Sequence, residues 1–167
     1  MPKLAGPPPQ ADPPFVGDHL AMDLAASFWL YPGYDYSAQQ VSEAVIRIRR
    51  RKLPDPARLG NAGSFFKNPV VTASEAETLR RNHPEMPAWP LNDDRAKLSA
   101  AWMIDRLGLK GESEGEASVS EQHALVLVNN GGASGEQVWR LACRVREAVE
   151  RHFAVRLEPE PRIVDLS

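Results

Sequence analysis

The segment Gly60–Pro69 constrains this chain more than any other part of it. It reads Gly-Asn-Ala-Gly-Ser-Phe-Phe-Lys-Asn-Pro, so two glycines bracket a tight stretch of backbone and a hydroxyl, an aromatic pair, a cation, an amide and a proline follow. An ordinary turn would need only the glycines and Asn61. The order of residues therefore predicts a site at which backbone, hydroxyl, ammonium and amide groups converge on a polar, anionic ligand.

Capping boxes predict where several helices begin, because a Ser or Thr side chain followed three residues later by Glu or Gln satisfies free amide groups at a helix start. The three boxes are Ser37–Gln40, Thr72–Glu75 and Ser134–Gln137, and the helices that they start are expected to end before Pro54, at about Asn82 and at Phe153 respectively. A further helix is expected around Leu98 to Asp105.

Two segments read as extended chain. Ala124–Asn129 is a short apolar run bounded by Asn-Gly-Gly, which is typical of a buried strand. Val155–Val164 alternates prolines with charges, which confines it to a sheet edge or a strand end. Between the helices, the acidic stretch Glu112–Glu121 is expected to be a solvated loop and not a metal site, since hard-cation loops favour Asp and Asn around an obligatory glycine. Alternating helices and strands indicate α+β or α/β layers.

The chain is expected to divide at Ser37. Residues 1–14 hold six of its fifteen prolines, so residues 1–36 are interpreted as a proline-rich tail or the remnant of a preceding domain. Residues 37–167 form the main domain.

Composition narrows the classes of protein. A net charge of -2 disfavours nucleic-acid binding, because such domains are usually basic. No run approaches the roughly 20 apolar residues of a membrane span. The first residues lack an apolar signal core, and the one cysteine, Cys143, excludes an internal disulfide. We therefore expect a soluble cytoplasmic protein without nucleic-acid, membrane or metal partners.

The residues alone leave the roles of individual side chains open. Ser64 lacks the Gly-x-Ser-x-Gly context of a hydrolase nucleophile, so a hydrolase is disfavoured. Two roles remain for it, a turn residue or a ligand contact. Glu160, between two prolines, is a strand-end carboxylate or a site residue. His123 is a satisfied edge histidine or a ligand. Neither a Walker loop nor a Gly-x-Gly-x-x-Gly turn is present.

The order of the motifs resembles one family, UDP-N-acetylenolpyruvoylglucosamine reductase, from about Ser37 to Val164. That family is the flavoprotein that makes UDP-N-acetylmuramate for peptidoglycan. The segments that carry the resemblance are Leu53–Pro56, Gly60–Pro69, Lys97–Gly111, His123–Asn129, Gly131–Ala133 and Leu157–Arg162.

The resemblance implies an α+β fold, in which a small sheet with packed helices forms the family's C-terminal substrate-binding domain. It implies Ser64 as proton donor and Glu160 as the active-site glutamate. It also implies that Lys52, Asn68 and His123 contact UDP-N-acetylglucosamine enolpyruvate. The family's FAD, reduced by NADPH, is held by N-terminal domains with no counterpart in this sequence, so no cofactor-binding residue is expected here.

Two functions of different class follow from the resemblance. The chain is the substrate and proton-donor half of an oxidoreductase, active together with a separate FAD-binding half, or it is a truncated, non-catalytic UDP-sugar-binding or remnant module. Without the missing domains, Phe65, Phe66 and Trp102 are candidates for exposed apolar surface.

Overall fold

The computed structural model describes residues 37–164, apart from the side chains of Ala44 and Lys52. The interpretation of residues 1–36 as a tail or domain remnant lies outside the described residues. The chain divides into two compact units, residues 1–49 and 50–167, and the expected domain division at Ser37 stays a prediction. Each unit is considered by itself.

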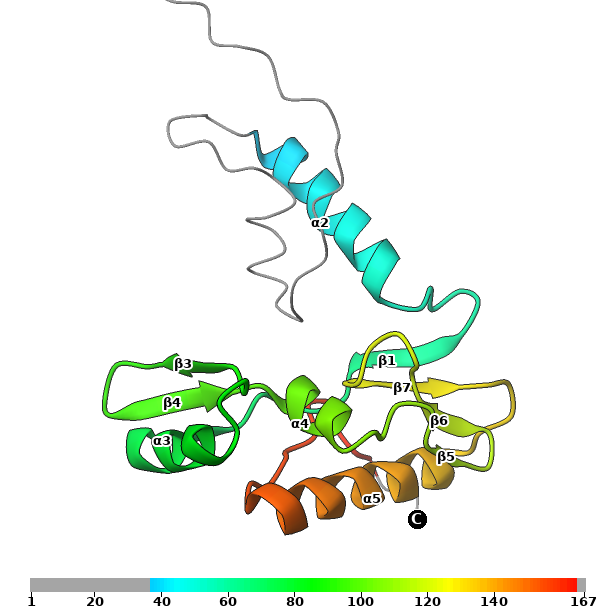
Figure 1. The fold of residues 1–167 in the computed structure, drawn as a ribbon. Coiled ribbons are helices and arrows are strands. Elements are labelled where there is room, and N and C mark those ends of the chain that lie inside the picture. Colours follow the sequence, from blue (N-terminus) through cyan, green and yellow to red (C-terminus); the bar gives the residue numbers. More distant parts are fainter. Residues whose placement is uncertain (1–36, 165–167) are drawn as a thin grey trace, which may run out of the picture. The chain divides into compact units, whose positions relative to one another are not determined.

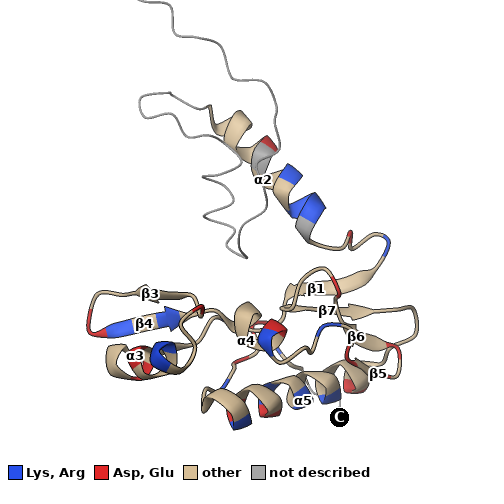
Figure 2. Cartoon of the chain, viewed as in Figure 1, with Lys and Arg blue, Asp and Glu red and all other residues tan. Residues whose placement is uncertain are grey.

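Helix α2, Ala38–Lys52, belongs mainly to the first unit. Its predicted capping box is confirmed, since the Gln40 amide donates to Ser37 Oγ (3.2 Å) and the Ser37 amide donates to Gln40 Oε1 (2.9 Å). Basic residues gather in its C-terminal half, where the helix dipole favours cations (Figure 2). No helix among the described residues has the length and apolar content that a membrane crossing requires.

The second unit contains two small antiparallel sheets with packed helices, which confirms the α+β class (Figure 1). The four-stranded sheet has the order β1-β7-β6-β5, and α5 packs along it; the three-stranded sheet has the order β2-β4-β3, and α3 packs on it. The elements are β1 (Gly60–Ser64), β2 (Val70–Thr72), α3 (Ala73–Asn82), β3 (Ala88–Pro90), β4 (Arg95–Leu98), α4 (Ala100–Arg106), β5 (Ser113–Glu114), β6 (Ala117–Val119), β7 (Val126–Asn129) and α5 (Gly135–Phe153).

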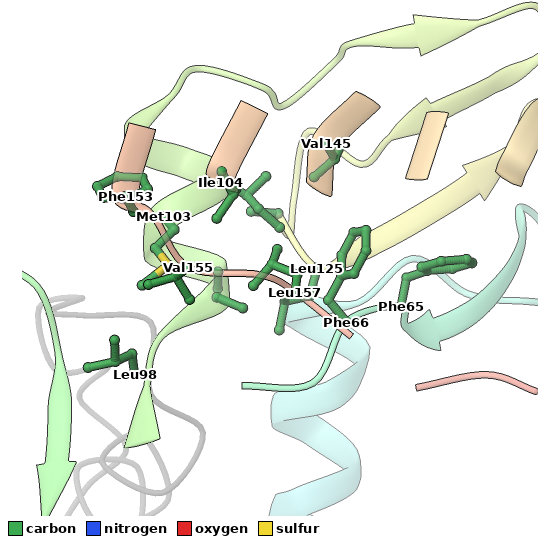
Figure 3. Close-up of a cluster of buried hydrophobic side chains, with 14 of the residues drawn as sticks. Phe65, Phe66, Leu98, Met103, Ile104, Leu125, Val145, Phe153, Val155 and Leu157 are labelled. Atoms are coloured by element: carbon green, nitrogen blue, oxygen red, sulfur yellow. The ribbon is translucent and has the colours of Figure 1, made fainter. Parts of the chain in front are cut away.

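The core forms where the apolar face of α5 meets the four-stranded sheet, α4 and the C-terminal segment (Figure 3). Phe65 and Phe66 are buried in it, with relative exposures of 4% and 2%. The expectation that these two rings form exposed apolar surface is therefore wrong. Trp102 is half-buried, with its ring centroid 5.9 Å from that of Phe153. Phe66 lies beside Leu125 and Leu157 in this core (Figure 3).

The acidic stretch Glu112–Glu121 is not a simple loop, as the sequence suggested, because it contains the hairpin β5–β6. Ala117 and Val119 are buried on its inner side. The guanidinium of Arg144 on α5 donates to Glu112 Oε1 (2.6 Å), to Glu114 Oε2 (2.9 Å) and to the backbone oxygen of Ser113 (2.7 Å). The glutamates thus balance a cation on a distant helix, a pairing that local composition does not reveal.

The start of α3 shows the predicted capping box in full. The Thr72 amide and hydroxyl donate to Glu75 Oε2 at 2.9 and 2.7 Å, and the Glu75 amide donates back to Thr72 Oγ1 at 3.2 Å. The hydrogen bonds from Thr72 lower the pKa of the Glu75 carboxyl. Because these bonds favour the ionised carboxylate, folding favours it too.

We expect this capping box to make stability depend on pH. The contribution of Glu75 is fully present above the pKa of the unfolded carboxyl and is lost as the pH falls through the lower pKa of the folded state. The difference in melting temperature between the wild type and Glu75→Gln, measured by circular dichroism, should therefore be largest near pH 7 and shrink in acid. Glu77→Gln, outside the box, is the control. A difference that stays constant with pH would contradict the assignment.

Candidate active site

Ser64 lies at the end of β1, directly after a β-bulge. Asn61 pairs with Val128 and Ser64 with Val126, so two residues of β1 oppose one residue of β7. Gly63 occupies the bulge with a φ of +76°, a left-handed conformation that favours glycine. The bulge therefore sets the direction of the next side chain, Ser64.

The half-buried Ser64 faces away from α5. Side chains that oppose each other in an antiparallel pair lie on the same face, so Ser64 shares a face with Val126. Leu127 alternates to the other face and belongs to the core against which α5 packs. The hydroxyl of Ser64 is thus on the sheet face that α5 leaves free.

The C-terminal segment brings Glu160 next to Ser64. The Glu160 amide donates to the backbone oxygen of Phe65 (2.8 Å), and the Lys67 amide donates to the oxygen of Glu158 (2.9 Å). Phe66 and Pro159 form an antiparallel bridge between these two bonds. Glu160 is therefore hydrogen-bonded to Phe65, the residue that follows Ser64, although 95 positions separate Glu160 from Phe65 in the sequence. Its side chain is exposed to solvent.

On its other side, the same strand end meets the loop that carries His123. The Phe65 amide donates to the oxygen of Leu125 (2.7 Å), and the Leu125 amide donates to Nδ1 of His123 (3.2 Å). The imidazole is half-buried. Ser64, Glu160 and His123 thus lie on three segments joined by backbone hydrogen bonds around Phe65. These three segments carry a hydroxyl, a carboxylate and an imidazole, groups that can hold and move protons.

Two predicted substrate contacts are not placed in this group by the structure. Asn68 Oδ1 accepts a hydrogen bond from the amide of Ala100 (3.0 Å), next to Ser99, whose hydroxyl accepts from the Trp102 amide (3.1 Å). Asn68 therefore helps to cap α4, a role that sequence reasoning missed. Lys52 is the last residue of α2, and its side chain lies outside the described part of the chain.

From the sequence, Asn61 and Gly63 are residues that an ordinary turn would need, and no further role is predicted for them individually. In the structure, the Asn61 side chain binds three backbone groups, and Gly63 forms the bulge. The local signal was present, since Asn two residues before a glycine is typical of a side chain that hydrogen-bonds its own backbone. The partners at Pro54 and Leu59 were not visible in that signal.

The chain is similar to known reductases. The family described as UDP-N-acetylenolpyruvoylglucosamine reductase, C-terminal domain, matches residues 55–164. Proteins named UDP-N-acetylenolpyruvoylglucosamine reductase from Chromobacterium violaceum, Azoarcus sp. and Pseudomonas aeruginosa are 56%, 52% and 55% identical over 74%, 93% and 76% of this chain. These matches cover 36%, 44% and 38% of those proteins, so the chain spans less than half of their length.

A solved structure is also similar. The crystal structure of UDP-N-acetylenolpyruvylglucosamine reductase from Thermus caldophilus is 28% identical, with a TM-score of 0.44. The match covers 73% of this chain and 33% of that one.

The bulge before Ser64 predicts a contrast between two glycines. An added Cβ would meet no atom within 4 Å at either Gly63 or Gly135, but only Gly63 has a positive φ. Gly63→Ala should therefore lower the free energy of unfolding by about 1–2 kcal/mol through backbone strain alone. Gly135→Ala, at the start of α5, should be neutral or stabilise the protein by up to about 1 kcal/mol. Urea denaturation measures both, and equal effects would contradict the strain at Gly63.

Proposed function

Because the chain belongs to the UDP-N-acetylenolpyruvoylglucosamine reductase family as a C-terminal domain, we propose that it is the substrate-binding and proton-donor half of that reductase. The reaction reduces UDP-N-acetylglucosamine enolpyruvate to UDP-N-acetylmuramate. The observation that supports the proposal is the backbone hydrogen bond from the Glu160 amide to the oxygen of Phe65, which joins the segment that carries the glutamate to the residue after Ser64.

The chemistry of the substrate explains the need for this pair. Hydride addition to the terminal carbon of an enol ether conjugated with a carboxylate builds negative charge on the adjacent carbon. In our proposal, Ser64 donates the proton that this carbon takes up; a serine hydroxyl is a weak acid, but the carbon is strongly basic. Glu160 acts at the enolpyruvyl carboxylate in its protonated form, or through a bridging donor, because two bare carboxylates would repel each other.

The hydride must come from elsewhere in the reductase. A hydroxyl, a carboxylate and an imidazole can transfer protons but cannot supply a hydride, so these side chains fit the proton half of the reaction and not a flavin site. In our proposal, the FAD and the NADPH that reduces it are bound by another part of the enzyme, in a longer chain or in a companion chain.

The remaining substrate contacts are assigned by the family resemblance. Lys52 neutralises the diphosphate, and His123 lines the substrate near Ser64. Asn68 uses its Oδ1 to cap α4, which leaves its amide nitrogen as the group to contact the substrate. The same fold without its flavin half also fits a non-catalytic UDP-sugar-binding module, and the measurement of turnover separates the two functions.

The first test is calorimetric titration of the flavin-free protein with UDP-N-acetylglucosamine enolpyruvate. We expect saturable binding that weakens by about 10- to 100-fold in Lys52→Ala, because a hydrogen bond to a charged group contributes about 1.5–3 kcal/mol. Lys97→Ala, which removes an exposed lysine from β4 of the second sheet, should bind as the wild type does. A folded protein that does not bind the substrate would refute the proposal.

The second test adds a separate flavin half and measures turnover. Ser64→Ala should bind the substrate normally but lose about 10²- to 10⁴-fold in kcat, the usual contribution of a positioned proton donor. Ser74→Ala, at an exposed position on α3, is the matched control. If the substrate binds and no flavin half restores turnover, the chain is a binding module.

A further inference from the structure

We propose that Asn61 is a positioning residue that holds Ser64 at a fixed place relative to the segment Leu53–Leu59, which directly follows Lys52. The inference rests on the proposed function, because it concerns the spacing between the proton donor and the diphosphate-binding lysine. Asn61 itself does not touch the reacting atoms in this proposal. It acts through the backbone groups that it binds.

The side-chain amide of Asn61 makes three hydrogen bonds in two directions. Nδ2 donates to the backbone oxygens of Leu59 (2.9 Å) and Pro54 (3.3 Å), and Oδ1 accepts from the amide of Gly63 (3.1 Å). The amide offers two N–H donors, and both have a partner. One half-buried side chain therefore connects the bulge before Ser64 with both ends of the preceding loop.

The loop itself is a compact unit. The amides of Arg58 and Leu59 both donate to the backbone oxygen of Asp55 (2.9 Å each), and the Ala57 amide donates to Asp55 Oδ1 (3.0 Å). These bonds hold the loop together internally. The bond from Asn61 to Pro54 ties the far end of the loop to β1, and the two bonds from Asn61 satisfy a carbonyl oxygen at each end of the loop.

The bulge depends on the same side chain. A bulge residue loses its regular partner in the strand ladder, so its backbone groups need another one. Asn61 Oδ1 supplies it for the Gly63 amide. The position therefore requires two donors and one acceptor at the length of an asparagine. Aspartate keeps the acceptor and loses both donors, and alanine loses all three.

The test uses Asn61→Asp and Asn61→Ala in the full chain, with UDP-N-acetylglucosamine enolpyruvate as the probe in calorimetry. The titration is done at a temperature at which both variants are fully folded, and both should then bind the probe about tenfold more weakly than the wild type. Both lose the two hydrogen bonds from Nδ2 to the loop, and tenfold corresponds to the free energy of about one net hydrogen bond. The Gly63 amide resonance in a ¹⁵N-labelled sample should keep its chemical shift in Asn61→Asp and move in Asn61→Ala.

Two further variants separate positioning from stability. Thr72→Ala removes the helix cap of α3, on the second sheet, and should lower stability comparably without weakening binding. The double variant Asn61→Asp with Lys52→Ala should bind no more weakly than the weaker single variant, because Asn61 acts through the segment that directly follows Lys52.

Three outcomes overturn the inference. These are unchanged binding in Asn61→Asp, equal weakening in Thr72→Ala, and additive losses in the double variant. In each of them the wild type still binds the probe, so the proposed function survives. If the folded wild-type protein does not bind the probe, the proposed function and this inference fail together.

Discussion

The candidate site depends on the backbone of one residue, Phe65. Its amide donates to Leu125 and its carbonyl accepts from Glu160, so segments from the middle and the end of the chain meet at the residue after Ser64. Its buried ring, in edge contact with that of Phe66, anchors the same point in the core. The backbone around Ser64 and Glu160 is thus held in place by groups of Phe65 that take no part in proton transfer themselves.

The polar residues of the glycine motif divide their work between structure and site. Asn61 and Asn68 both hydrogen-bond the backbone, the first at the loop and the bulge and the second at the start of α4. Two residues of a motif that was expected to contact a ligand, Asn61 and Asn68, therefore stabilise the backbone on either side of the Ser64 hydroxyl. This arrangement suits a proton donor, because a hydroxyl transfers its proton well only from a fixed position.

The starts of α2, α3 and α5 could be predicted from local sequence, whereas α4 begins at Ala100 and the expected first residue, Leu98, ends β4. Each of the three capping boxes is closed by hydrogen bonds between residues three positions apart, so a short sequence pattern is enough to predict it. The hairpin at Ser113–Val119 could not be predicted, because its acidic residues are balanced by Arg144, some thirty positions away. The burial of Phe65 and Phe66 also depends on distant partners.

The sequence by itself determined the family and, through it, the α+β class, together with the starts of α2, α3 and α5 and a strand within Ala124–Asn129, since these follow from propensity, periodicity and the order of motifs. Only the tertiary structure decided that the backbone of Glu160 pairs with Phe65, the residue after Ser64, that the bulge at Gly63 turns Ser64 to the face away from α5, and that Asn61 joins the loop to the strand. The physical reason is that hydrogen bonds between segments far apart in the chain form only when the core brings their backbones within about 3 Å, a condition that no local pattern contains.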